Sequence, residues 1–308
     1  MRIRATVAAV SGALALSALA LPAAHAAGTA APSYQEGAAK VLRAARAAHG
    51  MSAFTAAKPA TGRPYALHAT FSNLKIGKAY KVGTTNHVAL SVSYTLTHGT
   101  EVNIKASDFA TGPYIYKGVS SNPSKVIFGD DAATCTATSS TVAVCKGDID
   151  IHPSDGLLEN ADAGSWNVGA LAIKWNGQQG KANPDLSKVG VAEKGGLGST
   201  LIQRNATLTT DASPEPVKKG ATITVKGKLS RANWETGHYG AYGSQSVKLQ
   251  FAKKGSTTWT TLETVKGDSA GNLKTTVKAS VDGSFRYSFA GNSTTSAVTS
   301  ASGFVDVK

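Results

Sequence analysis

The chain has 308 residues and a formal net charge of +13, with 42% hydrophobic and 17% charged residues. Its length suffices for two hydrophobic cores of ordinary size, and the abundance of Thr, Ser, Val and Gly favours a soluble two-domain chain with few long helices. The two cysteines do not predict a metal site, because no other cysteine exists and His152 alone cannot complete a ligand set. The sequence also contains no phosphate-binding glycine loop, dinucleotide fingerprint or paired-histidine metal helix.

The first 26 residues have the features of a secretory signal peptide. Arg2 and Arg4 form a basic head, residues 5–21 are apolar and uncharged, and Ala24-His25-Ala26 fits the small-x-small rule of a signal peptidase site. We therefore predict cleavage after Ala26 and a secreted, extracellular protein. No second apolar run of roughly 20 residues follows, so we expect no membrane anchor.

Residues 27–62 are expected to form a flexible N-terminal segment with one short helix. The stretch 35–49 is the only convincing helical pattern, and its apolar stripe is thin, with Val41 and Leu42 as the only large members. Because a short isolated helix is marginal in water, the pattern indicates either a loosely docked helix or an interaction tail.

We expect residues 63–205 to form an antiparallel β-sandwich, because short alternating runs are separated by turn residues at regular spacing. The strongest run, 87–98, places Val88, Leu90, Val92, Tyr94 and Leu96 on one strand face. Further strands are expected at 65–71, 102–104, 114–116, 142–151, 165–175 and 197–204.

Cys135 and Cys145 occupy a segment, TCTATSSTVAVCK, that has the pattern of a hairpin with its tip near Ser139-Ser140. The two sulfurs would then face each other across neighbouring strands. Since exported proteins meet an oxidising environment, the sequence predicts a disulfide between them. Two free buried thiols are the alternative.

Residues 206–308 carry the most regular alternation in the chain, with Phe285, Tyr287 and Phe289 two positions apart on one strand face. Seven strands are expected, which is the number in an immunoglobulin-like sandwich, although the antibody-type disulfide is missing. The predicted strands are 206–211, 221–230, 246–253, 257–266, 272–279, 284–290 and 303–307.

The segments PVKKGATITVKGKL, SVKLQFAKKGSTTWTTLETVK and GNLKTTVKASVDGSFRYSFAGNSTT resemble the bacterial immunoglobulin-like modules of secreted and surface proteins. The whole mature chain also resembles a group of uncharacterised two-domain secreted bacterial proteins, some of them labelled calcium-binding. The resemblance implies a spacer, adhesion or recognition role, and it brings no catalytic residues to this chain.

A possible nucleophile motif, Gly267-Asp268-Ser269-Ala270-Gly271, fits G-x-S-x-G. A serine nucleophile needs a histidine base and a following helix, yet the next residues, NLKTTVKAS, have a strand pattern. His238 is the only histidine of this domain and belongs to another loop. We interpret the motif as a hairpin tip and expect no catalytic residues.

The acidic segment 148–162 raises the question of calcium. Asp148, Asp150, His152 and Glu159 align with positions of a twelve-residue calcium loop, but Pro153 replaces the required glycine and histidine is a poor calcium ligand. A solvated strand and turn is therefore the favoured interpretation. A weak, non-helical calcium site remains the alternative, with Asp155, Glu159 and Asp162 as candidate ligands.

The loop RANWETGHYGAYGSQ holds four aromatic or imidazole side chains among glycines. Rings on a loop can stack on sugars or peptides. Alternatively, the tryptophan and one tyrosine fold back and close an end of the sandwich. The candidate ligand-binding residues are Trp234, His238, Tyr239 and Tyr242.

These observations lead us to expect a secreted, non-enzymatic, all-β protein that acts in adhesion or at the cell envelope, with the immunoglobulin-like domain as scaffold. Expected partners are a cell-wall or extracellular polymer or a surface protein. Residues 206–308 carry 13 basic and 7 acidic groups, which suits anionic polymers, although lysines spread along strands also protect against aggregation. No specific nucleic acid binding is expected. The alternatives are a carbohydrate-binding module, a calcium-binding extracellular protein and, less favoured, a secreted hydrolase or inhibitor.

Overall fold

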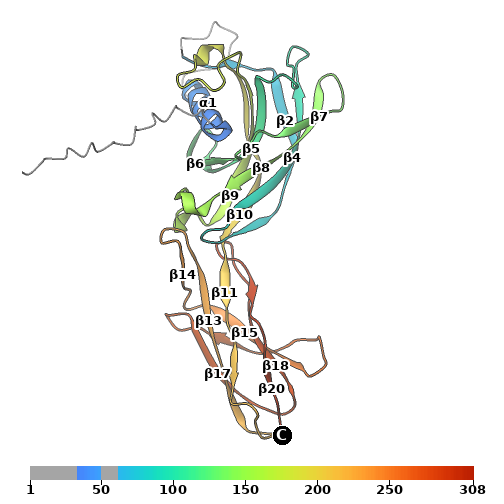
Figure 1. Ribbon diagram of the computed structural model, residues 1–308, viewed down its shortest axis with the longest axis vertical. Coiled ribbons are helices and arrows are strands. Elements are labelled where there is room, and N and C mark those ends of the chain that lie inside the picture. Colours follow the sequence, from blue (N-terminus) through green and yellow to red (C-terminus); the bar gives the residue numbers. More distant parts are fainter. Residues whose placement is uncertain (1–32, 50–61) are drawn as a thin grey trace, which may run out of the picture. The chain divides into compact units, whose positions relative to one another are not determined.

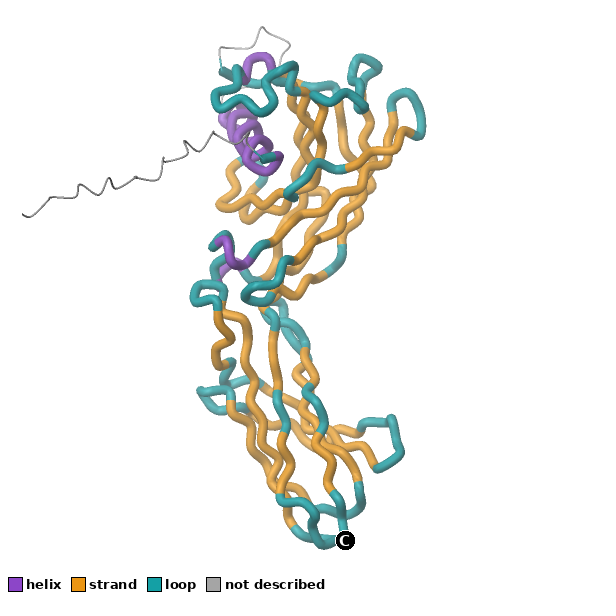
Figure 2. The backbone as a smooth tube through the Cα atoms, in the orientation of Figure 1, coloured by secondary structure: helices purple, strands orange, loops and turns teal. Residues whose placement is uncertain are grey.

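Alternating apolar residues build two β-sandwiches in the computed structural model, which describes residues 33–49 and 62–308 (Figures 1 and 2). Two sheets are formed by strands up to Arg204, and two by strands from Ala206 onward. The predicted all-β class is thereby confirmed. The predicted signal peptide and its cleavage site lie outside the described residues. Within residues 33–49 and 62–308, no helix has the length and hydropathy of a membrane span.

The first sandwich pairs a six-stranded sheet with a four-stranded sheet. The six-stranded sheet has the order β1-β10-β9-β5-β6, with β3 paired to β10, and the four-stranded sheet has the order β2-β4-β8-β7. The strands are β1 (Tyr65–Ala66), β2 (Ala69–Ile76), β3 (Ala79–Val82), β4 (Val88–His98), β5 (Phe109–Val119), β6 (Asn122–Phe128), β7 (Thr134–Ala137), β8 (Val142–Ile151), β9 (Gly164–Lys174) and β10 (Gly190–Arg204).

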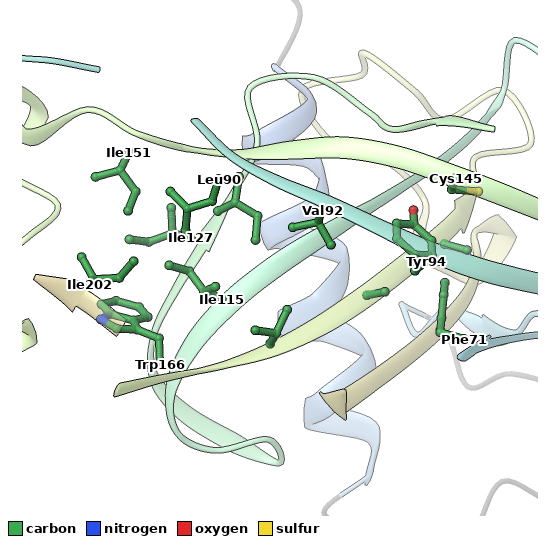
Figure 3. Packing of buried hydrophobic residues seen from close by; sticks show 14 of the residues in the cluster. Phe71, Leu90, Val92, Tyr94, Ile115, Ile127, Cys145, Ile151, Trp166 and Ile202 are labelled. Carbon is green, nitrogen blue, oxygen red and sulfur yellow. The ribbon is translucent and has the colours of Figure 1, made fainter. Parts of the chain in front are cut away.

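The core of this sandwich lies between the two sheets (Figure 3). From β4, every second side chain points inward, as the sequence predicts, and the opposite sheet contributes large apolar groups. Each of these side chains is almost fully removed from solvent, so their burial is a main source of the domain's stability. The chief members are Leu90, Val92, Tyr94, Leu96, Ile115, Ile127, Trp166 and Ile202.

Helix α1 (Tyr34–His49) forms a third layer on the outer face of the six-stranded sheet (Figure 1). Val41 and Leu42 are buried against side chains of β5, β6 and β9. Arg46 forms a largely buried ion pair with Glu193, at 2.9 Å between Nη2 and Oε1. The helix is therefore firmly docked, and the expectation of a flexible segment with a loosely held helix is corrected for residues 34–47. Small alanines allow the helix to approach the sheet closely despite its thin apolar stripe.

Four strand predictions for the first domain need correction. Residues 102–104 form no strand, because backbone N–H groups of Val102 and Ala106 close turns onto Gly99 and Asn103 instead of joining a sheet. The predicted strand 114–116 is the central part of the longer β5, and 197–204 is the C-terminal part of β10. The predicted strand 65–71 is divided between β1 and β2. Strands β3 and β6 were missed in the sequence, whereas β4 and β8 match their predicted ranges to within a residue.

The disulfide is confirmed. Cys135 on β7 and Cys145 on β8 are direct cross-strand partners and are bonded through their sulfurs. The hairpin turn around Ser139 and Ser140 closes with the Thr138 N–H on the Val142 carbonyl. The bridge ties the edge strand β7 to the buried strand β8, and Cys145 lies in the core.

The second sandwich has the strand order of an immunoglobulin-like domain. One sheet joins β11, β12, β13 and β17, with β14 added at its edge, and the facing sheet has the order β16-β15-β18-β19, with β20 also on β18. The strands are β11 (Ala206–Leu208), β12 (Asp211–Ser213), β13 (Thr222–Asn233), β14 (His238–Ala241), β15 (Ser246–Lys253), β16 (Thr260–Lys266), β17 (Asn272–Lys278), β18 (Gly283–Phe289), β19 (Val298–Thr299) and β20 (Gly303–Val305).

Strand β18 supplies the aromatic core of this domain. Phe285, Tyr287 and Phe289 all point inward, as their spacing predicts. The Tyr287 hydroxyl donates a hydrogen bond of 3.0 Å to the Val225 carbonyl on the facing sheet. A buried hydroxyl without a partner would be costly, so this bond both satisfies the tyrosine and joins the two sheets.

Candidate functional site

Two histidines and two aspartates gather at one end of the β4–β8 strand pair. The antiparallel register pairs Val88 with Ile151, so His87 and His152 stand opposite each other one step beyond the ladder. Asp150 lies two residues before His152 and therefore on the same face of β8. The two imidazole rings stack, with centroids 4.5 Å apart and planes 10° from parallel.

Asp130 reaches the same place from the segment that follows β6. Gly129 passes so close to β8 that a side chain at this position would collide with the Asp148 carbonyl oxygen. This close approach lets the Asp130 N–H donate a hydrogen bond of 2.9 Å to the Asp150 carboxylate. The glycine thus explains how residues from three separate segments meet.

The cluster consists of two histidine–carboxylate pairs. His87 Nε2 lies 2.6 Å from Asp150 Oδ1, and His152 Nε2 lies 2.8 Å from Asp130 Oδ2. The hydrogen bond to Asp130 raises the pKa of the His152 imidazole above its ordinary value. Asp150 is nearly buried, with 12% of its side chain exposed, whereas His87 is half exposed.

The sequence interpretation missed this cluster, because it treated His152 as unable to complete a ligand set. In the described part of the chain, one group of histidine and acidic side chains has donor atoms that all lie within 4.8 Å of one another. Its members are His87, Asp130 and His152. The signal that could have found them is the register of 87–98 against 142–151, since these two strands were both predicted.

The structure does not bring the candidate calcium ligands together. Glu159 and Asp162 cap the short 3₁₀ helix 160–162 reciprocally, and Asp162 also pairs with Lys125. Asp155 belongs to a different 3₁₀ turn and is exposed. Asp148, from the calcium-loop alignment, accepts a hydrogen bond from Ser91 on the neighbouring strand. These carboxylates are engaged in local structure.

The aromatic loop is divided between two packing environments. Trp234 is 4% exposed and joins the core cluster of the first sandwich, where its indole N–H donates to the Val82 carbonyl. Tyr242 packs edge-on against Phe289 of the second sandwich and under the Arg231 guanidinium, 4.0 Å from the ring centre. Neither ring is therefore presented for stacking on a ligand.

His238 and Tyr239 remain exposed at the start of the short edge strand β14. Tyr239 is 39% exposed, and its hydroxyl accepts a hydrogen bond of 2.9 Å from the Asn205 side chain. The His238 ring bonds the Thr236 carbonyl. Of the four candidate ligand-binding residues, only this adjacent pair offers an accessible surface.

The G-x-S-x-G segment is a turn between β16 and β17, which belong to opposite sheets rather than to one hairpin. The Asp268 carboxylate accepts hydrogen bonds from the backbone N–H groups of Ala270 and Asn272 and from the Asn272 side chain. These bonds hold the pKa of Asp268 below its ordinary value. Asp268 closes its own turn, and a strand follows Ser269 where a nucleophile elbow has a helix.

Lysines converge where the β12–β13, β15–β16 and β17–β18 connections meet the C-terminal residues. The Lys219 N–H bonds the Lys308 carbonyl, and the Lys254 N–H bonds the Asp282 carbonyl, so these segments lie side by side. Lys219, Lys253, Lys254 and Lys308 line one shallow hollow there. Within it, the Asp282 carboxylate accepts hydrogen bonds from Lys254 and from the Val307 N–H. This group is referred to below as the lysine hollow.

No protein-family model matches the chain, and no curated protein matches it significantly. Among solved structures, it is similar to the Yersinia pseudotuberculosis adhesin InvE (10% identity, TM-score 0.24, 77% of this chain and 58% of that one). It is also similar to the D0-D1 domain of intimin (13% identity, TM-score 0.23, 76% of this chain and 98% of that one). A third similar structure is the Escherichia coli adhesin FdeC (11% identity, TM-score 0.27, 79% of this chain and 66% of that one). TM-scores this low do not establish a common fold. The immunoglobulin-like description of the second sandwich therefore depends on its strand order.

Proposed function

We propose that this chain is an exported, non-catalytic binding protein that attaches to an anionic polymer of the cell envelope or extracellular matrix. The observation that carries the proposal is the lysine hollow on an immunoglobulin-like scaffold. Of its four lysines, Lys254 pairs with Asp282 and Lys308 with Asp306. Lys219 and Lys253 form no ion pair within the described part of the chain, so the hollow keeps a net positive charge. A concentrated positive field attracts polyanions and weakens with salt.

The first sandwich would accompany this binding domain as a second, independently stabilised domain. It is stabilised by a disulfide and a docked helix, which suits a protein exposed to an oxidising exterior. The predicted signal peptide supports the same location.

The test is co-sedimentation of the purified mature chain with washed envelopes of the organism that encodes it, at rising salt. Lys219→Glu combined with Lys253→Glu should abolish sedimentation. The matched control is Lys226→Glu combined with Lys274→Glu, which makes the same change in net charge on exposed, paired strand positions and should leave sedimentation close to wild type. Equal loss in both double variants would show a non-specific charge effect and contradict the proposal.

A carbohydrate-binding role is the second candidate, and the exposed Tyr239 ring favours it. A glycan array should then show binding by the wild type that Tyr239→Ala abolishes. Tyr239 is the appropriate residue for this test because Trp234 is buried and its removal would disturb packing. Absence of glycan binding by the wild type would eliminate this candidate.

A further inference from the structure

The cluster of His87, Asp130 and His152 has the composition of a transition-metal site. Each residue offers one donor atom, and the three atoms lie within 4.8 Å of one another. Two imidazoles and one carboxylate suit zinc, which binds nitrogen and oxygen donors tetrahedrally. Calcium prefers six to eight oxygen ligands, so this donor set does not suit it.

Asp150 does not belong to this donor set but holds one of its members, His87, by a hydrogen bond. It bonds Nε2 of His87, which leaves Nδ1 of the same ring as the free donor nitrogen. Metal-binding histidines commonly donate their second ring N–H to a carboxylate, which fixes the tautomer and the ring orientation. Asp150 is itself held by the Asp130 N–H, so one carboxylate orients two members of the group.

The remaining coordination position would face solvent. The side chains of His87 and Asp130 are 48% and 49% exposed, so water or a donor from another molecule can reach an ion between them. The backbone around the site is well ordered by the β4–β8 ladder and by the close approach of Gly129. The backbone positions of the three residues are thus set by the fold before any ion arrives.

We propose that His87, His152 and Asp130 bind one zinc ion at the surface of the first sandwich, with Asp150 as the positioning residue of His87. The site is independent of the lysine hollow, since it uses another domain and another chemistry. Without a metal, the same contacts amount to two histidine–aspartate ion pairs, and the experiment below separates the two cases.

The experiment is calorimetric titration of ZnCl₂ into the metal-free mature chain, prepared without a polyhistidine tag. We expect one zinc ion per chain and a higher melting temperature in zinc. His87→Ala, His152→Ala and Asp130→Asn should each remove this binding, and Asp150→Asn should weaken it by about 10- to 100-fold. CaCl₂ should give no such binding.

The matched control is His68→Ala, because His68 and Glu101 form an exposed histidine–carboxylate pair at 2.7 Å elsewhere on the same domain. It should bind zinc like the wild type. Melting curves without metal establish that each variant folds, and the exposed Asp130→Asn carries the test if a histidine variant does not. The proposal is overturned if the wild type takes up no zinc, if the ligand variants bind as His68→Ala does, or if calcium binds in place of zinc.

Discussion

Single polar side chains stabilise the turns of this protein, and Asp268 is the clearest case. Its carboxylate accepts three hydrogen bonds within five residues, from the Asn272 side chain and from the backbone of Ala270 and Asn272. These bonds, first among them the one from the Asn272 side chain, are stronger to the ionised carboxylate and therefore lower the pKa of Asp268. Asp268, which lies within an apparent nucleophile motif, thus has a conformational role in the structure.

This linkage predicts the pH dependence of Asp268→Ala. A carboxyl group with a lowered pKa in the folded state stabilises that state above its unfolded pKa of about 3.9 and loses the effect as pH falls through its folded pKa. The variant should therefore melt below the wild type by a constant interval from pH 5 to 7, and the interval should shrink below about pH 4. Calorimetric melting over this range measures it, and an interval that widens in acid would be inconsistent with the assignment.

The residues show where sequence reasoning succeeds and where it stops. Cys135 and Cys145 flank a short polar turn, so their local spacing together with the predicted export was enough to predict their bond. The partners of His152 lie 65 residues before it and 22 before it, and only the β4–β8 register and the path of Gly129 bring them close. Trp234 likewise could not be placed from its glycine-rich surroundings, because its burial depends on packing against another domain's core.

At the scale of elements, helix α1 shows how a weak local pattern becomes a firm tertiary contact. Its propensity for independent folding is small, but the six-stranded sheet is apolar on both faces, with Leu171 and Ile173 turned towards the helix. The buried Arg46–Glu193 pair fixes its orientation. Strands such as β4 were predictable because their period of two is local, whereas the docking of the helix depends on a surface made by distant strands.

Leu42→Ala tests this docking. Because Leu42 is 2% exposed, its truncation should lower the free energy of unfolding of the first domain by about 2–5 kcal/mol. Arg43→Ala, at the next and exposed position, is the control and should change stability little. Urea unfolding followed by tryptophan fluorescence gives both values. If the two variants have the same free energy of unfolding, the helix is not held against the sheet in solution.

At the scale of the whole molecule, residues 33–49 and 62–308 belong to one compact unit although they contain two sandwiches. Trp234 belongs to the immunoglobulin-like segment by sequence and to the first sandwich by packing. Asn160 adds polar contacts, with its side chain donating to Asn233 and accepting from the Trp234 N–H. We interpret the aromatic loop chiefly as a joint between the two domains.

Trp234→Ala should consequently destabilise the first sandwich, by about 3–5 kcal/mol for a buried aromatic ring, and should separate thermal unfolding into two transitions. Trp259→Ala is the control, because Trp259 stacks under Arg286 within the second domain and should leave the first sandwich unchanged. Differential scanning calorimetry combined with amide hydrogen exchange of β3 and β4 distinguishes the variants. If the amide hydrogen exchange of β3 and β4 is the same in Trp234→Ala as in the wild type, the loop does not join the two domains.

The central claim is that a positively charged, non-catalytic scaffold attaches to an anionic polymer outside the cell. Its most direct test is the salt-dependent co-sedimentation of the purified mature chain with isolated envelopes. The account predicts that the wild type sediments at low salt, is released as salt rises, and stays in solution when Lys219 and Lys253 are both changed to Glu. A wild-type chain that stays in the supernatant at every salt concentration would contradict it.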